Sequence, residues 1–214
     1  MSISYRSTVA SPGPAHGEGV RLSVNVSSRY LNHGNVAGDV RAALAAHQVR
    51  ADSLILEVTE SLLLENSTQL EQTFKDLKMI GVRLALDDFG TGYSSLSYLH
   101  RFPIDILKID RSFVERLVRD REGIEGVDAV ALARAILSLA EALGLDTVAE
   151  GIEFEAQREI LLGLGCKTGQ GYVFGKAMPI DEVLDAAVTR RRSLLAGNLA
   201  GPVDYSPTGR FRGI

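Results

Sequence analysis

The chain has 214 residues, of which 45% are hydrophobic and 23% are charged, and this composition excludes a chain that is disordered throughout. Its 23 Lys and Arg residues and 27 Asp and Glu residues give a formal net charge of -4, which argues against a basic surface for duplex DNA or anionic membranes. No apolar run reaches the roughly 18 residues that a membrane span requires.

The cysteine content and the two chain ends bear on compartment and domain limits. The single cysteine, Cys166, has no partner for an internal disulfide, which favours a reducing, cytoplasmic setting. Residues 1–19 are rich in Ser, Gly and Pro and lack the apolar core of a signal peptide, so we expect a flexible leader there. Residues 199–214 combine turn formers with scattered charge, so we expect a flexible tail after one folded domain at residues 20–198.

Short apolar runs alternate with longer segments along residues 20–198. The runs that we expect to form β-strands are Val20–Val26, Ser53–Val58, Val82–Leu86, Ile104–Ile109, Asp146–Ala149 and Gly171–Phe174. Nearly continuous apolar runs of this length are typical of parallel strands that are covered on both faces. Strand-helix alternation repeated about six times predicts an α/β fold with a parallel sheet, either closed as a barrel or open and doubly wound.

Apolar spacing predicts the helices between these strands. Leu70, Phe74 and Leu77 fall at positions i, i+4 and i+7 of one helical face. A second stripe consists of Leu132, Ile136, Leu139 and Leu143. Three predicted helices are followed by the residue type that commonly ends a helix, at Gly81, Gly144 and Gly165.

Polar side chains recur at the ends of the apolar runs. They are Asn25, Glu57, Glu60, Asp87, Asp88, Lys108, Glu150, Glu153 and Gln170. Because the carboxyl ends of barrel strands converge on one rim, we expect these side chains to lie together. Their oxygens suit hard divalent cations such as Mg2+ or Mn2+, whereas zinc prefers nitrogen and sulfur. A pair of such ions can activate water against a phosphodiester, and Lys108 would then orient that water or neutralise the phosphate.

Individual acidic residues have simpler explanations, because most Asp and Glu side chains are solvated surface charges or helix caps. Glu60 stands at the expected start of a helix, where the dipole favours a carboxylate. Asp110 has the position of a helix cap, and Gln170 would fit an ordinary turn. Recurrence at the ends of six runs favours a shared site over these separate explanations.

The segments around these residues resemble the EAL-domain family of cyclic di-GMP phosphodiesterases. The matching segments, spread over about residues 20–190, are Leu22–Ser27, Leu56–Ser61, Leu86–Leu99, Leu107–Phe113, Ala149–Glu153 and Gly169–Phe174. The resemblance implies an incomplete TIM-type (β/α)8 barrel, with about six of the eight strand-helix units present. It also implies metal-dependent hydrolysis of one phosphodiester bond in cyclic di-GMP, which yields linear pGpG.

The resemblance implies a role for each polar residue at the rim. The implied ligands of Mg2+ or Mn2+, two ions in the family, are Asn25, Glu57, Asp87 and Asp88. Glu150 would fall at a metal or water-organising position, Lys108 would contact the catalytic water, and Gln170 would help to arrange the same cluster. Glu60 would hold the loop Phe89–Leu99, which in the family links the metal site to a dimer interface and implies a homodimer. Glu153 would lie on the substrate side.

One part of the family pattern has no match in Met1–Gly19. In the family, two strands, several helices and the Glu-Ala-Leu motif precede the segment that matches Leu22–Ser27, and the Glu of that motif is a metal ligand. Removing such a ligand is expected to weaken metal binding roughly 10- to 100-fold, so we expect inefficient hydrolysis by this chain alone. A misplaced start codon or a truncated gene would explain the difference. The alternative to a phosphodiesterase is a degenerate, non-catalytic module that binds cyclic di-GMP or a protein. A third possibility, a different metal-dependent barrel hydrolase, agrees less well with the ordered matching segments.

Overall fold

The computed structural model describes residues 21–64, 67–90, 99, 101–119, 124–177, 179, 182 and 208–210. Its strands are β1 (Leu22–Asn25), β2 (Leu54–Thr59), β3 (Arg83–Phe89), β4 (Ile106–Ile109), β5 (Asp146–Ala149), β6 (Thr168–Gln170) and β7 (Thr208–Arg210). Its helices are α1 (Ser28–His33), α2 (Val36–His47), η1 (Ala51–Ser53), α3 (Glu60–Leu63), α4 (Thr68–Ile80), α6 (Arg111–Arg119), α7 (Ile124–Ala142) and α8 (Glu155–Gly163). The expected leader and most of the predicted dimer loop, Phe89–Leu99, lie outside the described residues.

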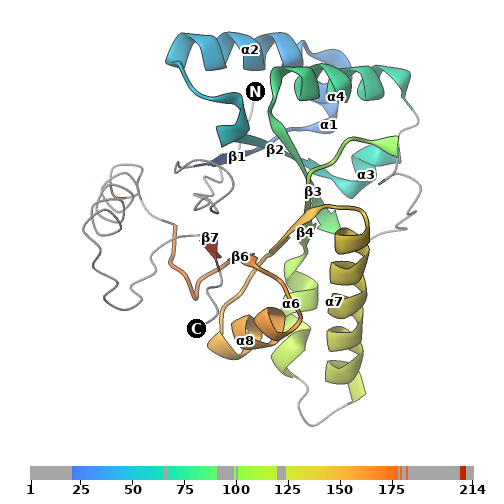
Figure 1. Cartoon of the computed structure of the whole chain (residues 1–214), viewed down its shortest axis with the longest axis vertical. Helices are drawn as coiled ribbons and strands as arrows, with labels where there is room; N and C mark the ends of the chain where they lie inside the picture. Colours follow the sequence, from blue (N-terminus) through green and yellow to red (C-terminus); the bar gives the residue numbers. More distant parts are fainter. Residues whose placement is uncertain are drawn as a thin grey trace.

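The described strands form one sheet in chain order, from β1 to β7. β1 to β6 run parallel, and each pairs with the next. β7, which falls in the segment expected to be a tail, pairs antiparallel with β6. In Figure 1 the strands curve in an arc and the helices lie on its outer side. The described fold is therefore a half-barrel of six parallel strands and helices, as the predicted strand-helix units imply.

The main apolar core fills the space between the sheet and the helices. Leu84 and Leu107 of the central strands are fully buried in it. The stripe predicted for α4, which consists of Leu70, Phe74 and Leu77, is also fully buried in this core. Helical spacing thus identified the face with which α4 covers the sheet.

The second predicted stripe, on α7, is only partly right. Ile136 is 5% exposed, but Leu132 is 43% exposed. The buried face of α7 instead joins Ile136 to Ala133 and Ala140, whose small side chains contribute to the core without a bulky apolar signature. Among the described residues, none of the helices combines the length and apolar character that crossing a bilayer requires.

The prediction of a strand at Gly171–Phe174 is wrong. β6 ends at Gln170, and the Phe174 N–H donates to the Gly171 carbonyl oxygen at 3.1 Å in a turn. The Ile152 N–H donates to the Gln170 carbonyl oxygen at 3.0 Å, so the chain here bonds to the loop after β5. A Cβ atom at residue 171 would lie 2.2 Å from the Ile152 carbonyl oxygen. This close approach requires glycine and explains why the apolar run turns away from the sheet.

An ion pair fastens α4 to the amino-terminal end of the sheet. Both carboxylate oxygens of Asp105, which precedes β4, lie 2.7 Å from Lys78 Nζ. The same carboxylate accepts a hydrogen bond from the Leu84 N–H at 2.8 Å, and the Asp105 carbonyl oxygen accepts from the Asp146 N–H at 3.0 Å. This half-buried pair therefore connects α4, β3, β4 and β5 at the end of the sheet where the strands begin.

Candidate active site

Two layers of side chains lie on the face of the sheet that points away from the helices. Near the strand beginnings, Ile55, Ala85 and Ile106 form a small buried cluster apart from the main core, with Val148 packed against it. Because side chains alternate along a strand, the residue two positions further on lies on the same face. These next residues are Glu57, Asp87, Lys108 and Glu150. The interior of the arc therefore changes from apolar to charged towards the carboxyl ends of the strands.

Lys108 is the centre of the charged layer. Its Nζ lies 2.7 Å from Glu57 Oε2, 3.1 Å from Asp87 Oδ1 and 2.6 Å from Glu150 Oε1. The four side chains are only 4% to 13% exposed. Four side chains that the sequence assigned to one rim are thus in direct contact, with the ammonium between three carboxylates.

Burial and neighbouring charges shift the pKa values of Lys108 and Glu150. Burial acts to lower the pKa of Lys108, but the carboxylates of Glu150, Glu57 and Asp87 outweigh it, so the pKa lies above its ordinary value. Burial raises the pKa of Glu150, Lys108 opposes this shift, and repulsion from Asp87 adds to it. Both pKa values can be raised together because Lys108 has three carboxylate partners, whereas Glu150 has one ammonium partner that it shares with Glu57 and Asp87.

We expect a Glu150→Gln variant to be more thermally stable than the wild type in EDTA at about pH 8. The raised pKa means that the folded chain holds the Glu150 proton more tightly than the unfolded chain, so ionised Glu150 costs stability above its folded-state pKa. Thermal unfolding measured from about pH 8 to below the ordinary pKa of 4.5 should show the advantage disappearing, because Glu150 is then protonated in both the folded and the unfolded chain. A stability gain that persisted unchanged at low pH would contradict this explanation.

Asn25 and Gln170 end the first and the last of the parallel strands. Asn25 is half-buried and pairs in register with Glu57, so the amide lies beside the carboxylate on the same face. Gln170 closes β6 and does not open a strand as the sequence indicated, but it still stands at a carboxyl end. Both amides therefore lie on the rim that carries the charged layer.

A β-bulge positions the two adjacent acids of β3. The register of β3 with β4 shifts between Leu86 and Phe89, so that Asp87 and Asp88 together face the single residue Lys108. Asp88 has φ 57°, a left-handed conformation that Asp tolerates better than most residues, and it is exposed. The extra residue restores the alternation, so both Leu86 and Phe89 pack in the main core while Asp87 lies on the inner face.

Glu60 joins the end of β2 to the end of β3. It is the first residue of α3, as the helix-start explanation requires, and it is 7% exposed. Its Oε2 also accepts a hydrogen bond from the Gly90 N–H at 3.1 Å, thirty residues away in sequence. Glu60 therefore anchors the point at which the chain leaves β3, just after Asp87 and Asp88.

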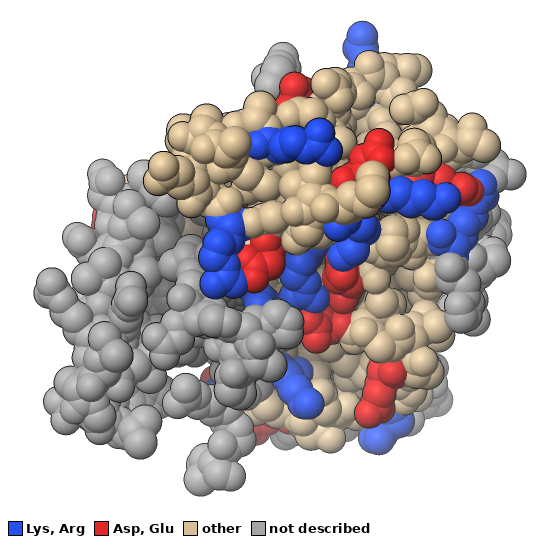
Figure 2. All heavy atoms as spheres, turned by 45° about the horizontal axis from the view of Figure 1, so that its top comes forward, with Lys and Arg blue, Asp and Glu red and all other residues tan. Residues whose placement is uncertain are grey.

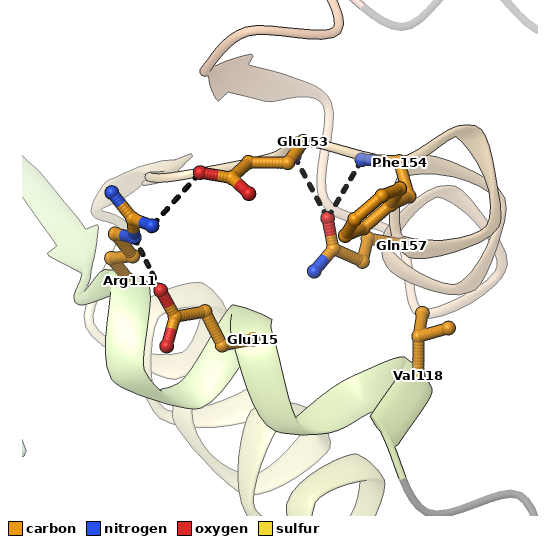
Figure 3. Close-up of a pocket in the computed structure, with 6 residues that line it drawn as sticks. All are labelled: Arg111, Glu115, Val118, Glu153, Phe154 and Gln157. Carbon is orange, nitrogen blue, oxygen red and sulfur yellow. Dashed lines mark hydrogen bonds and ion pairs between the residues drawn. The ribbon is translucent and has the colours of Figure 1, made fainter.

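Glu153 lies at a pocket between α6 and α8. The pocket has a volume of about 260 Å3 and is lined by Arg111, Glu115, Val118, Glu153, Phe154 and Gln157. Figure 3 shows Arg111 between the two acids, with its Nη2 2.8 Å from Glu153 Oε1 and its Nε bonded to Glu115. Asp110 Oδ1 accepts from the Ser112 N–H at 3.0 Å, so Asp110 caps α6, as the simpler explanation predicted.

Gln157 is a positioning residue that the sequence analysis missed. It is 1% exposed, and its Oε1 accepts from the backbone N–H groups of Glu153 at 2.8 Å and Phe154 at 3.0 Å (Figure 3). Its Nε2 donates to the Val114 carbonyl oxygen at 3.1 Å. Gln157 therefore ties the loop that follows Glu150 to α6, and its place at the third position of α8 was the available signal.

The donor set of the charged layer suits a hard cation. Carboxylate and amide oxygens are the ligands that Mg2+ and Mn2+ prefer. The buried Glu150 Oε1 has the Lys108 ammonium, at 2.6 Å, as its charged partner. In the arrangement seen, however, no group of three His, Cys, Asp or Glu side chains among the described residues is spaced to hold a metal ion. The carboxylates converge on the Lys108 ammonium instead.

Comparison with known proteins identifies the family. The EAL domain family matches residues 8–177. This chain belongs to the EAL domain family. As an EAL domain, it is 42% identical over 163 residues to the bifunctional diguanylate cyclase/cyclic di-GMP phosphodiesterase MucR of Pseudomonas aeruginosa. That alignment covers 76% of this chain and 23% of MucR, so this EAL domain spans about a quarter of that relative.

Solved structures share the fold of this EAL domain. A PaMucR phosphodiesterase in complex with c-di-GMP superposes with a TM-score of 0.69 at 41% identity, over 76% of this chain and 64% of that one. A manganese/cy-diGMP complex of Klebsiella pneumoniae BlrP1 gives a TM-score of 0.65 at 33% identity, over 73% of this chain and 38% of that one. The neighbours are TIM-like barrels, which agrees with the barrel alternative of the predicted parallel sheet.

Proposed function

We propose that this chain binds cyclic di-GMP and, with Mg2+ or Mn2+, hydrolyses one of its phosphodiester bonds to give linear pGpG. The observation that carries this proposal is the buried cluster of Glu57, Asp87 and Glu150 around Lys108 at the carboxyl ends of parallel strands. Relatives named as cyclic di-GMP phosphodiesterases and a neighbour solved with manganese and the dinucleotide support it.

Each side chain at the rim has a distinct role in this proposed reaction. The oxygens that would hold the divalent cation belong to Asn25, Glu57, Asp87, Asp88 and Glu150. A cation bound there would supply an activated water and neutralise charge on the phosphate. Lys108 would donate N–H bonds to the attacking water, and Gln170 would support the cluster. Glu60 holds the chain at Gly90, and Glu153, which pairs with Arg111, would border the substrate.

The charge distribution fits a small anionic ligand better than duplex nucleic acid. Figure 2 shows Lys and Arg side chains interspersed with Asp and Glu side chains over the face in view. Ion pairs such as Arg83–Asp146 and Arg101–Glu71 engage basic groups of the described residues. A duplex would require a continuous basic stripe to replace its counterions. We therefore expect the dinucleotide, and not duplex DNA, to be the ligand.

Incubation of the purified chain with cyclic di-GMP and Mn2+ tests the proposal, with pGpG measured by chromatography. We expect turnover that EDTA abolishes and that an Asp87→Ala variant lowers by roughly 100-fold or more, because a ligand carboxylate is lost. Asp52→Ala is the matched control, since Asp52 forms its ion pair with the exposed Arg50 at the opposite end of β2. Binding without turnover would make the chain a receptor instead, and turnover that survives Asp87→Ala would exclude this site.

A further inference from the structure

The Lys108 ammonium occupies the position where the rim carboxylates converge. An ammonium has three N–H donors, and Nζ has three carboxylate neighbours within 3.1 Å, on Glu57, Asp87 and Glu150. The Lys108 side chain is 5% exposed, so water solvates its charge only weakly. Glu57 lies in β2, Asp87 lies in β3 and Glu150 directly follows β5, so the ammonium draws three strand ends together.

The cluster keeps an excess of negative charge. One ammonium offsets one of the three carboxylates in contact with it, which leaves two negative charges when all are ionised. Buried charges without a partner are costly, so the cluster would accept a divalent cation. The same carboxylate oxygens cannot bind the ammonium and a divalent ion tightly at the same time, because the two cations repel each other at short range.

We propose that Lys108 is the built-in counter-cation of the metal-free site, and that a divalent ion must displace its ammonium from Glu57 and Asp87 in order to bind. This inference rests on the cation site in the proposed function. The spacing of the described carboxylates supports it, because they surround Nζ and form no group ready to hold a metal. Lys108 thus preserves the rim without metal and lowers its affinity for metal.

Lys108→Met, which keeps the length of the side chain and removes its charge, tests the proposal. In EDTA we expect the melting temperature of this variant to fall by roughly 10 °C, because three buried carboxylates lose their partner. Saturating Mn2+ should recover most of that loss, since the metal replaces the missing charge. Isothermal titration with Mn2+ alone should give a Kd roughly tenfold or more tighter than that of the wild type, because the competing cation is gone.

Lys78→Met is the matched control, because it makes the same change at the Lys78–Asp105 pair, where the strands begin. It should lower the melting temperature without recovery by Mn2+ and leave the Mn2+ Kd unchanged. If Lys108→Met is unstable without metal, purification in Mn2+ followed by EDTA should unfold it while the wild type stays folded.

The outcomes separate this inference from the proposed function. Lys108→Met that binds Mn2+ no more tightly than the wild type, or that fails to fold even in Mn2+, would overturn the counter-cation role. Absence of Mn2+ binding by the wild type and by both variants would overturn the cation site itself and, with it, the proposed function. Tighter binding with recovery specific to Lys108→Met supports both.

Discussion

A Glu57→Gln variant is expected to lose at least roughly 1,000-fold in kcat/KM for cyclic di-GMP hydrolysis, equivalent to about 4 kcal/mol of transition-state stabilisation. Glu57 is 3% exposed and contacts Lys108 at 2.7 Å, so the change removes a charge from the centre of the cluster while keeping its shape. A neutral amide is a poorer ligand for Mg2+ or Mn2+ than a carboxylate. Hydrolysis assays at saturating Mn2+ and Mn2+ titration should therefore show losses together.

The stability of this variant separates a chemical effect from misfolding. One of three carboxylates around a single ammonium becomes neutral, so the melting temperature in EDTA should stay the same or rise. Glu159→Gln, at an exposed position of α8, is the matched control and should leave turnover and Mn2+ binding unchanged. Hydrolysis by Glu57→Gln within threefold of the control would remove Glu57 from the site.

Strand bounds were predictable from the sequence where a helix and a polar loop flank the apolar run. Asp146–Ala149 is β5 as predicted, because a short apolar run lies between a helix and a polar loop.

The end of β3 was not predictable in this way. β3 was predicted to end at Leu86, since two adjacent acids interrupt the apolar pattern, but the strand continues to Phe89. The bulge that admits both acids depends on the backbone conformation of Asp88, which alternation alone does not specify.

The site was predictable in location but not in arrangement. The shared rim followed from polar residues at the strand ends, and Glu57, Asp87, Lys108 and Glu150 are in contact there. The central position of Lys108 could not be predicted, because it depends on which face of the sheet each side chain points to. That face depends on the residue at which each strand begins. The apolar residue two positions earlier, Ile106 in β4, would have indicated the inward direction once the register was known.

A Phe74→Ala variant is expected to lose about 3–5 kcal/mol of stability, the largest effect that we expect in the main core. Phe74 is fully buried on α4, and its ring packs edge-on against Phe102, with centroids 5.4 Å apart and planes at 71°. Arg101 lies over the Phe102 ring at 5.5 Å and pairs with Glu71, so this packing holds the chain segment that leads into β4. Thermal unfolding should show a melting temperature lower by roughly 10 °C or more.

Met79→Ala is the matched control for this loss, because Met79 lies on the same helix and is 74% exposed. It should change stability by less than about 0.5 kcal/mol. Both variants should keep the stabilisation that Mn2+ gives the wild type, because Phe74 lies in the core between sheet and helices while Lys108 and its carboxylates lie on the opposite face. Equal melting temperatures for the two variants would show that this core does not hold the segment before β4, and loss of the Mn2+ effect in Phe74→Ala would show that the two faces are coupled.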